Sequence, residues 1–248
     1  MIIGVIPARY ASSRFPGKPL VDILGKTMIR RVYEQAIKCS QLNRVVVATD
    51  DDRIASEVQS FGGEFVLTSS LHPSGTDRCA ETARILNLSD SDVIINIQGD
   101  EPFIDPSQIA TLCACFDDES VELATLVKSF RQAEEVLRDS TIKVVLDEQQ
   151  YALYFSRAVI PFTREVPTDG MVPLETYVQH IGIYGYRAAT LQKIAQLPLS
   201  SLENIEKLEQ LRWLENGYRI LTARSEHESF SVDTPEDLIK ISSHFSGE

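Results

Sequence analysis

Basic side chains gather in a loop near the N-terminus, where they could bind an anion. Arg9, Arg14 and Lys18 lie between a short apolar run, Ile2–Ile6, and a helical pattern that starts near Lys26. Arginine offers phosphate oxygens a planar fork of donors, and lysine offers a compact point charge. A solvated surface loop could carry the same residues, but the whole chain has a net charge of −12, which makes a local basic segment distinctive. We predict that this loop clamps the phosphates of a nucleotide.

Two aspartates follow apolar runs and could bind a divalent cation. Asp100 comes directly after the run 93–97 and Gly99, whose lack of a side chain lets the backbone approach a ligand closely. Mg²⁺ commonly takes one or two carboxylates together with substrate phosphate oxygens. Taken alone, Asp233 is better explained as a cap of the helix that starts near Pro235. Because it can be paired with Asp100, we predict that both aspartates bind Mg²⁺.

Two further polar segments admit a structural explanation. The segment Ser74–Arg78 could place backbone amides against a base or a phosphate, or it could cap the helix that follows, and both could hold. The acidic run Asp50–Asp52 suggests a metal site, but acidic residues at a helix start are more often caps and partners of the helix dipole. We leave that run out of the predicted catalytic set.

Strand-like runs alternate with helical patterns through about residue 116. Alternation of this kind, with apolar strands, predicts a Rossmann-like, doubly wound α/β sheet that is mixed but mostly parallel. The ligand edge of such a sheet is at the carboxyl ends of its strands. The predicted strands are Ile2–Ile6, Val45–Ala48, Phe65–Leu67 and Val93–Ile97, and the predicted helices are 26–39, 50–60, 77–88 and 106–116.

The pattern changes after that point, and we predict a small antiparallel insertion. Residues 160–178 are rich in proline and carry seven apolar side chains, which we expect to form a dimer interface. A single domain spans 1–248, with 1–120 mainly binding the nucleotide and about 150–190 binding the second substrate and a partner copy. Strands are predicted at Leu123–Lys128, Ile142–Leu146, Ala152–Phe155, Ile181–Tyr186 and Ile220–Ala223, and helices at Leu202–Glu215 and from about Pro235.

Composition excludes several other classes of protein. The strong negative charge argues against binding to nucleic acid or to an anionic membrane, and no apolar run is long enough to cross a bilayer. The N-terminal run lacks the basic region of a signal peptide. No CxxC pair is present, so we expect the cysteines to be buried free thiols in a reducing cytoplasm: Cys39, Cys79, Cys113 and Cys115.

Seven segments together resemble a known family. The N-terminal loop is similar to the signature loop of sugar nucleotidyltransferases, in the form found in the 3-deoxy-manno-octulosonate (Kdo) cytidylyltransferases. The resemblance extends over nearly the whole chain, with the segments in that family's order. They are Ile6–Leu20, Val47–Asp51, His72–Arg78, Asn96–Pro102, Tyr154–Arg157, His180–Tyr186 and Leu208–Arg212.

The resemblance implies a cytoplasmic, Mg²⁺-dependent homodimer that joins CTP and Kdo into CMP-Kdo and pyrophosphate, for lipopolysaccharide synthesis. Carried over by position, it implies a triphosphate site at Ala8, Arg9, Ser13, Arg14 and Lys18, with Arg9, Lys18, Asp100 and Asp233 catalytic. It also implies a cytosine site at Ser74, Gly75, Thr76, Asp77 and Arg78. The sugar pocket would comprise Gln98, Arg157, His180, Tyr184, Glu209 and Gln210.

Two of these implied roles are open to a simpler explanation. Glu209 and Gln210 could be solvated on the predicted helix, and His180 could be a structural residue at the start of its strand. Arg157 is the natural partner of the sugar carboxylate.

Three rival functions remain at this point. A cytidylyltransferase for another acidic sugar, such as sialic acid, would share the basic loop and the Gly-Asp motif. A non-catalytic nucleotide sensor would be favoured by the loss of a magnesium carboxylate, but both carboxylates are present. A glycosyltransferase rests only on Asp50–Asp52.

Overall fold

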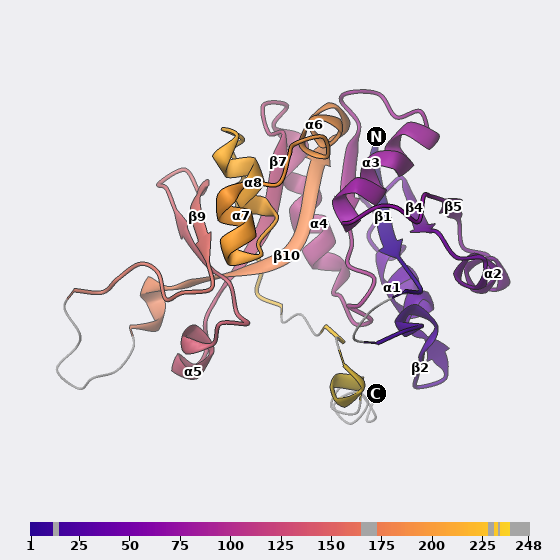
Figure 1. Cartoon of the computed structure of the whole chain (residues 1–248), viewed down its shortest axis with the longest axis horizontal. Coiled ribbons are helices and arrows are strands. Elements are labelled where there is room, and N and C mark those ends of the chain that lie inside the picture. The colour runs from indigo at the N-terminus through magenta and orange to yellow at the C-terminus, as the bar shows by residue number, and fades with distance from the viewer. Residues whose placement is uncertain (12–14, 165–172, 228–230, 233, 239–248) are drawn as a thin grey trace.

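A mixed β-sheet of nine strands runs through the molecule (Figure 1). The computed structural model describes residues 1–11, 15–164, 173–227, 231–232 and 234–238. The main path of the sheet has the order β11-β7-β10-β6-β1-β4-β5, and β8 and β9 extend it from β10. The strands are β1 (Ile2–Ala8), β4 (Arg44–Thr49), β5 (Phe65–Leu67), β6 (Val93–Asn96), β7 (Leu123–Ser129), β8 (Lys143–Leu146), β9 (Ala152–Ser156), β10 (Val178–Arg187) and β11 (Leu221–Arg224), and β2 (Asp22–Ile23) pairs separately with β3 (Lys26–Thr27).

The predicted parallel half of the sheet is confirmed. β1 pairs in parallel with both β4 and β6, and β4 pairs in parallel with β5. β10 runs antiparallel to its neighbours β6 and β7, so the sheet is mixed but mostly parallel, as predicted. The carboxyl ends of β1 and β6 therefore lie side by side, each followed by one of the predicted polar segments.

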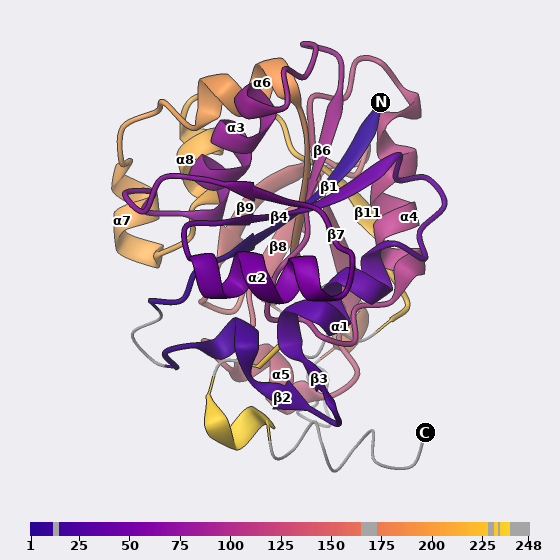
Figure 2. The same ribbon diagram turned by 90° about the vertical axis from the view of Figure 1, so that its right-hand side faces the viewer.

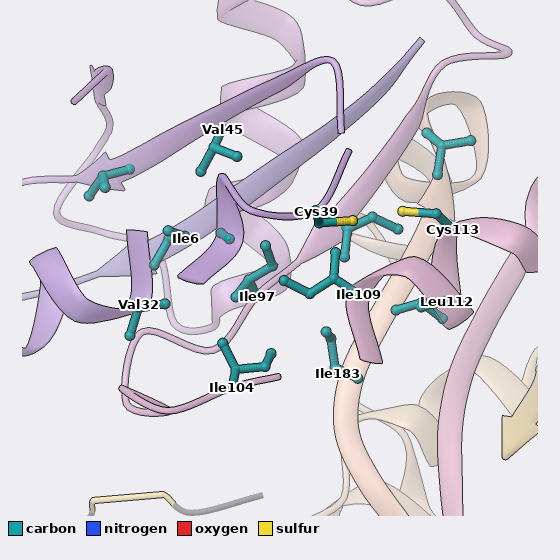
Figure 3. Close-up of a cluster of buried hydrophobic side chains, with 14 of the residues drawn as sticks. Ile6, Val32, Cys39, Val45, Ile97, Ile104, Ile109, Leu112, Cys113 and Ile183 are labelled. Atoms are coloured by element: carbon teal, nitrogen blue, oxygen red, sulfur yellow. The ribbon is translucent and has the colours of Figure 1, made fainter. Parts of the chain in front are cut away.

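Helices cover both faces of the sheet, as Figure 2 shows. On β1, Ile6 and Ala8 join one buried cluster and Ile3 and Val5 join the other, because successive side chains point to opposite faces. Figure 3 shows the first cluster, between the sheet and helices α1, α2 and α4. The helices are α1 (Met28–Ala36), α2 (Asp52–Ser60), α3 (Gly75–Ile85), α4 (Pro106–Ala114), α5 (Ala133–Leu137), α6 (Ala188–Ile194), α7 (Ser201–Glu206) and α8 (Gln210–Glu215).

The predicted helix 202–215 is wrong as one continuous element. The chain leaves α7 at Lys207, which adopts a left-handed conformation with φ 54°, and begins again at α8. The break allows Leu208 to be buried while the side chain of Glu209 reaches the start of α3. A single straight helix would hold these neighbours 100° apart with no such freedom of direction.

The antiparallel insertion is confirmed in the part that the structure describes. β8 and β9 form an antiparallel pair that extends from the main sheet, together with α5 (Figure 1). Of the apolar residues predicted to form a dimer interface, Val166, Met171 and Val172 lie outside the described residues. Phe162 is described, and 88% of its surface is exposed.

Two smaller predictions concern the cysteines and the acidic run. All four cysteines are free, and Cys39, Cys79 and Cys113 are buried, whereas Cys115 is only partly buried. Asp51 caps α2 by accepting from the backbone N–H of Arg53, so the structural explanation of Asp50–Asp52 is confirmed. Within the described part of the chain, no helix is long and apolar enough to cross a membrane.

A glycine pair on β10 yields a test of this packing. A Cβ added at Gly185 would lie 2.9 Å from Cζ of Phe116 and 3.1 Å from Cδ1 of Ile95, both in the core. A Cβ at Gly182, on the same strand, meets no atom within 4 Å. We expect Gly185→Ala to lower the free energy of unfolding in urea by about 1–3 kcal/mol, and Gly182→Ala to leave it nearly unchanged. Equal unfolding midpoints for the two variants would contradict this arrangement of the core.

Candidate active site

The central feature of the site is the contact between the ends of β1 and β6. The backbone at Gly99 passes so close to β1 that an added Cβ would lie 2.7 Å from the carbonyl oxygen of Pro7. Only glycine fits this approach, because a side chain here would clash with backbone rather than with a movable side chain. Asp100 is therefore held beside the start of the basic loop.

A cavity of ≈ 270 Å³ opens at this junction, and we call it the β1 cavity. It brings together the predicted residues Ala8, Arg9 and Lys18 of the basic loop, and Gln98 and Asp100 after β6. The other lining residues are Pro7, Pro19, His72, Pro73, Ser74, Gly75, Arg78 and Gly99. Four separate parts of the sequence thus meet around one basic pocket.

The ammonium group of Lys18 contacts two oxygen atoms at this cavity. Its Nζ donates to Oδ2 of Asp100 at 2.9 Å and to the carbonyl oxygen of Val232 at 2.8 Å. The ammonium group thus occupies a place between a carboxylate oxygen and a carbonyl oxygen, which are the ligand types that Mg²⁺ prefers. Arg9, in contrast, is exposed at the cavity wall.

Of the two predicted magnesium ligands, only Asp100 lies among the described residues. Asp100 lines the β1 cavity, and the cation that it contacts, Lys18, shows that this position accepts positive charge. Asp233, Ser13 and Arg14 lie outside the described residues, although Val232 and its contact with Lys18 bring the chain next to Asp233 to this position. Among the residues that the structure describes, no group of three or more His, Cys, Asp or Glu side chains could hold a metal by itself.

The segment Ser74–Arg78 caps a helix, as one of its two predicted roles requires, and part of it also lines a cavity. Ser74 caps α3 by accepting from the backbone N–H of Asp77, and Ser74, Gly75 and Arg78 also line the β1 cavity. Arg78 is buried and donates to the hydroxyl of Thr68. Thr76 and Asp77 are not among the residues that line this cavity; Thr76 is buried and faces Glu209 instead.

A second cavity of ≈ 400 Å³ lies along β10, and we call it the β10 cavity. Four of the predicted sugar-pocket residues, His180, Tyr184, Glu209 and Gln210, line it. Gln98 lines the β1 cavity but donates to the carbonyl oxygen of Gly182, which lines the β10 cavity, at 2.9 Å. The other lining residues are Glu101, Lys128, Ser140, Thr141, Ile142, Gln179, Ile181, Leu208 and Ser231.

Two side chains of the β10 cavity hold buried polar atoms without a hydrogen-bond partner among the described residues. They are the hydroxyl of Tyr184 and the amide Nε2 of Gln210, and the two residues are only 8% and 4% exposed. Unpaired buried donors cost free energy, so native structures rarely keep them without a ligand or water. Both side chains line the β10 cavity, so polar residues form part of its wall.

His180 is a neutral group in this cavity. Burial lowers its pKa to about 3. Oγ1 of Thr125 lies 2.7 Å from the carbonyl oxygen of Ile183, to which its only hydrogen can be donated, and 3.0 Å from Nε2 of His180. We therefore assign the proton of the ring to Nε2, which leaves Nδ1 as an acceptor.

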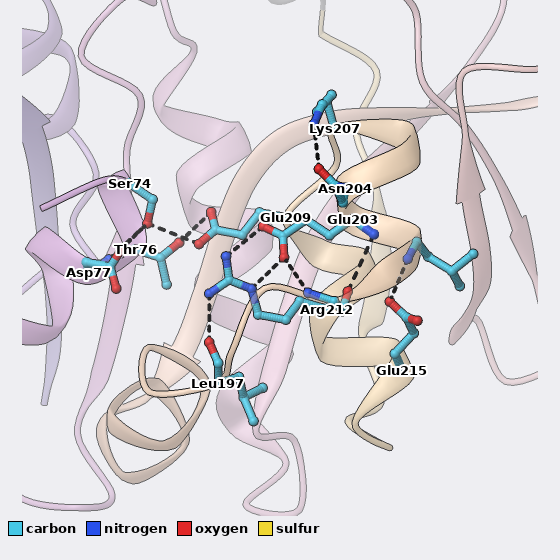
Figure 4. Close-up of polar contacts among 12 residues, drawn as sticks. Ser74, Thr76, Asp77, Leu197, Glu203, Asn204, Lys207, Glu209, Arg212 and Glu215 are labelled. Atoms are coloured by element: carbon cyan, nitrogen blue, oxygen red, sulfur yellow. Dashed lines mark hydrogen bonds and ion pairs between the residues drawn. The ribbon is translucent and has the colours of Figure 1, made fainter.

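Glu209 connects the β10 cavity, which it lines, to Ser74 of the β1 cavity through the polar contacts that Figure 4 shows. Its carboxylate accepts from Thr76 Oγ1 and lies near Ser74 Oγ, each at 3.0 Å, although Glu209 itself lines the β10 cavity. Burial raises its pKa, and the two hydroxyls oppose that rise. Arg212 binds Glu203 through two contacts of 2.6 Å, which fixes α8 against α7 and so sets the position of Glu209. The prediction of a merely solvated Glu209 is wrong, because the helix break turns it inward.

The predicted contact of Arg157 with the sugar acid stays a prediction. Arg157 is not among the residues that line either cavity. Its guanidinium donates to the carbonyl oxygens of Glu206 at 2.8 Å and Asp139 at 3.0 Å. The fully buried Lys143 donates to the carbonyl oxygens of Arg138, Thr141 and Arg157, so two cations tie this loop together.

Sequence reasoning missed several lining residues. His72 was within a family-like segment and could have been found; its Nε2 lies 2.6 Å from Glu81 Oε2. Lys128, Ser140 and Thr141 carry no sequence signal, because they reach the β10 cavity only through the pairing of β10 with β7 and β8.

The fold and the two adjoining cavities define an α/β nucleotidyltransferase, in which a basic pocket with a carboxylate lies beside a polar acceptor pocket. Residues 3–220 match the cytidylyltransferase family. The chain is 52% identical to the 3-deoxy-manno-octulosonate cytidylyltransferase of Parabacteroides distasonis over 96% of this chain and 95% of that one. It is 50% identical to the enzyme of the same name from Syntrophotalea carbinolica, with 99% of each chain covered. The chain therefore belongs to the 3-deoxy-manno-octulosonate cytidylyltransferases.

Solved structures agree with this assignment. A CMP:2-keto-3-deoxy-manno-octonic acid synthetase in complex with CTP superposes with a TM-score of 0.91 at 43% identity, covering 99% of this chain and 98% of that one. A 4-diphosphocytidyl-2C-methyl-D-erythritol synthase from Anaerococcus prevotii, at 10% identity and a TM-score of 0.61, shares the fold.

The lowered pKa of His180 gives a test in acid. The unfolded chain takes up a proton at this histidine near pH 6.5, whereas the folded protein does so only near pH 3, so stability falls as the pH drops through this window. We expect His180→Gln to remove part of this loss, up to about 2 kcal/mol at pH 5 and nothing at pH 8. Urea unfolding of both proteins at the two pH values measures it. An identical loss in both proteins would mean that folded His180 accepts a proton normally.

Proposed function

We propose that this protein transfers CMP from CTP to 3-deoxy-manno-octulosonate, giving CMP-Kdo and pyrophosphate. The observation that carries the proposal is the joining of two unlike cavities through Gln98 and Glu209. One cavity is basic and holds Asp100, and the other is lined mostly by polar side chains, which suit a polyhydroxylated substrate. The names of relatives at about half identity support the same donor and acceptor.

CTP fits the β1 cavity in this proposal. Arg9 and Lys18 hold the triphosphate, together with Ser13 and Arg14 of the same loop, whose places rest on the sequence resemblance. The start of α3 lines this cavity with Ser74 and Gly75, and the backbone N–H groups of a first helical turn suit the polar edge of cytosine. Thr76 and Asp77 hold this segment in place, because Thr76 donates to Glu209 and Asp77 accepts from Ser74.

Mg²⁺ belongs to the proposed site, with Asp100 and Asp233 as its protein ligands. The contacts of Lys18 with Asp100 and with the carbonyl oxygen of Val232 support this, because they show a positive charge between two oxygen atoms. When bound, Mg²⁺ neutralises phosphate charge and lowers the pKa of a hydroxyl that it contacts. Lys18 is then free to leave Asp100 for the phosphates of the leaving group.

The reaction needs little covalent chemistry from the protein. A hydroxyl oxygen of the sugar acid forms a bond to the α-phosphorus of CTP, the bond to the β-phosphate oxygen breaks, and the hydroxyl proton is released. Positioning and charge stabilisation dominate such in-line transfers. Arg9 and Lys18 stabilise the growing charge on pyrophosphate, and neutral His180 with Tyr184 and Gln210 orients the acceptor.

Three wider features of the proposal rest on less direct support. We place the enzyme in the cytoplasm, because its four cysteines are free, and its product in lipopolysaccharide synthesis by analogy with its relatives. We further propose a homodimer through the insertion after β9. The support is the exposed side chain of Phe162, which follows β9 in the sequence, and the exposed side chain of Leu153 on β9 itself.

The carboxylate at β6 tests the proposed chemistry. We expect Asp100→Asn to reduce pyrophosphate release from CTP and Kdo by more than about a thousandfold while the unfolding midpoint stays unchanged, because an amide is a poor ligand for magnesium. Asp52→Asn is the matched control, since Asp52 is exposed at the start of α2. Near-normal release by Asp100→Asn at saturating magnesium would contradict the proposed site.

Sedimentation equilibrium tests the proposed dimer. We expect a dimer at micromolar concentration for the natural sequence and a monomer for Phe162→Ser, because a polar residue in the interface removes buried apolar area. Leu71→Ser is the control, since Leu71 is also 88% exposed but lies before α3. A monomer for the natural sequence would remove the proposed assembly without affecting the proposed chemistry.

A further inference from the structure

Arg78 is the most deeply buried of the arginine and lysine side chains that line the β1 cavity. Only 3% of its surface is exposed, whereas Arg9 at the same cavity is exposed. A guanidinium group has five donors in a rigid plane and always carries a charge. Burial of such a charge is costly unless another group neutralises it and its donors are paired. The residues that contact Arg78 therefore decide where its donors can point.

Two side chains at the edge of the sheet receive this guanidinium. Its Nη2 lies 3.5 Å from Oδ1 of Asp50, and its Nη1 donates to the hydroxyl of Thr68. Oδ1 of Asp50 is buried, and among the described residues no hydrogen bond competes with Arg78 for this oxygen. The hydroxyl of Thr68 donates to the carbonyl oxygen of Thr49 at 3.1 Å, which leaves its oxygen as an acceptor for Arg78.

The parallel pairing of β4 with β5 places these two side chains together. Thr49, the last residue of β4, is opposite Leu67, the last residue of β5. Asp50 and Thr68 follow these strands directly, so both lie at the carboxyl edge of the sheet, where sheets of this kind bind ligands. Neither residue lines the β1 cavity, so Arg78 is the member of this group that can contact a ligand there.

The three aspartates of the run Asp50–Asp52 have different surroundings. Asp51 caps α2, and Asp52 is exposed in the first turn of that helix. Asp50 instead contacts Arg78, which belongs to α3. The capping of α2 therefore does not explain Asp50.

We propose that Asp50, together with Thr68, is a positioning residue of the CTP site, which holds the guanidinium of Arg78 at the wall of the β1 cavity. This inference rests on the proposed function and deepens it, because it assigns the groups that fix Arg78 before the nucleotide binds. An arginine that is already held in one orientation loses less rotamer freedom when the ligand arrives, and binding is stronger for that reason.

Removal of the Asp50 carboxylate separates positioning from a simple effect of charge. By charge alone, the loss of one negative group near a basic cavity would strengthen the binding of an anionic triphosphate. We expect the opposite: Asp50→Ala should raise the Kd for CTP, measured by calorimetry with Mg²⁺ and without Kdo, by about three- to tenfold. The KM for Kdo at saturating CTP should change by less than about twofold, because Arg78 does not line the β10 cavity.

A double-mutant cycle shows whether Asp50 acts through Arg78. In the Arg78→Met background, Asp50→Ala should change the Kd for CTP by less than about twofold, because no guanidinium is left to position. Thr68→Val keeps the shape of the side chain but removes the acceptor, and it should also raise the Kd for CTP. Asp52→Ala is the matched control, since it removes an equal charge from the exposed start of α2 and should not raise this Kd.

A second variant keeps the test decisive if Asp50→Ala does not fold. Asp50→Asn retains the volume of the side chain and should raise the Kd for CTP in the same direction, because the guanidinium loses its charged partner.

Three outcomes would overturn the inference. The first is an unchanged or lowered Kd for CTP in Asp50→Ala, and the second is an equal rise of this Kd in the Arg78→Met background. The third is a parallel rise of the Kd for CTP and the KM for Kdo, which would show that Asp50 only stabilises the fold. The absence of turnover by the natural enzyme with CTP and Kdo would instead refute the proposed function, and it is distinguishable because CTP binding is measured without Kdo.

Discussion

The ion pair between Lys18 and Asp100 is the interaction on which the candidate active site depends. It connects the loop after β1, the turn after β6 and, through the carbonyl of Val232, the C-terminal segment. No residue nearer than 80 positions in sequence makes these contacts with Lys18, so only the completed sheet can bring them together. The close passage of Gly99 over Pro7 fixes the spacing. A positive charge is therefore held beside a carboxylate at the carboxyl ends of β1 and β6.

A second set of contacts connects the β1 cavity with the β10 cavity. The break between α7 and α8 turns Glu209 toward the first turn of α3, and the Arg212–Glu203 pair holds that break in place. Gln98 forms the other link, from the end of β6 to the irregular part of β10 at Gly182. Donor and acceptor thus share walls, which limits how far apart their reacting atoms can lie and reduces the entropy lost in the reaction.

The sequence predicts the parallel half of this fold well, because buried strands and amphipathic helices leave distinct periods in it. It also predicts the β1 cavity, since Arg9, Lys18 and Asp100 all follow strands whose carboxyl ends share an edge. It fails where tertiary contacts override local pattern. The apolar period across 202–215 hides the break at Lys207, where the chain adopts a left-handed conformation. The residue type of Arg157 does not reveal its contacts, because its guanidinium donates to backbone carbonyl oxygens.

The central claim is that this site joins CTP to an eight-carbon sugar acid rather than using another nucleotide or acceptor. Pyrophosphate release measured across four nucleoside triphosphates and a set of sugar acids, with Kdo, sialic acid and a neutral hexose among them, tests it most directly. We predict that kcat/KM for CTP with Kdo exceeds kcat/KM for every other combination of nucleotide and acceptor by at least about a hundredfold. Equal or greater release with sialic acid, or with another nucleotide, would contradict it.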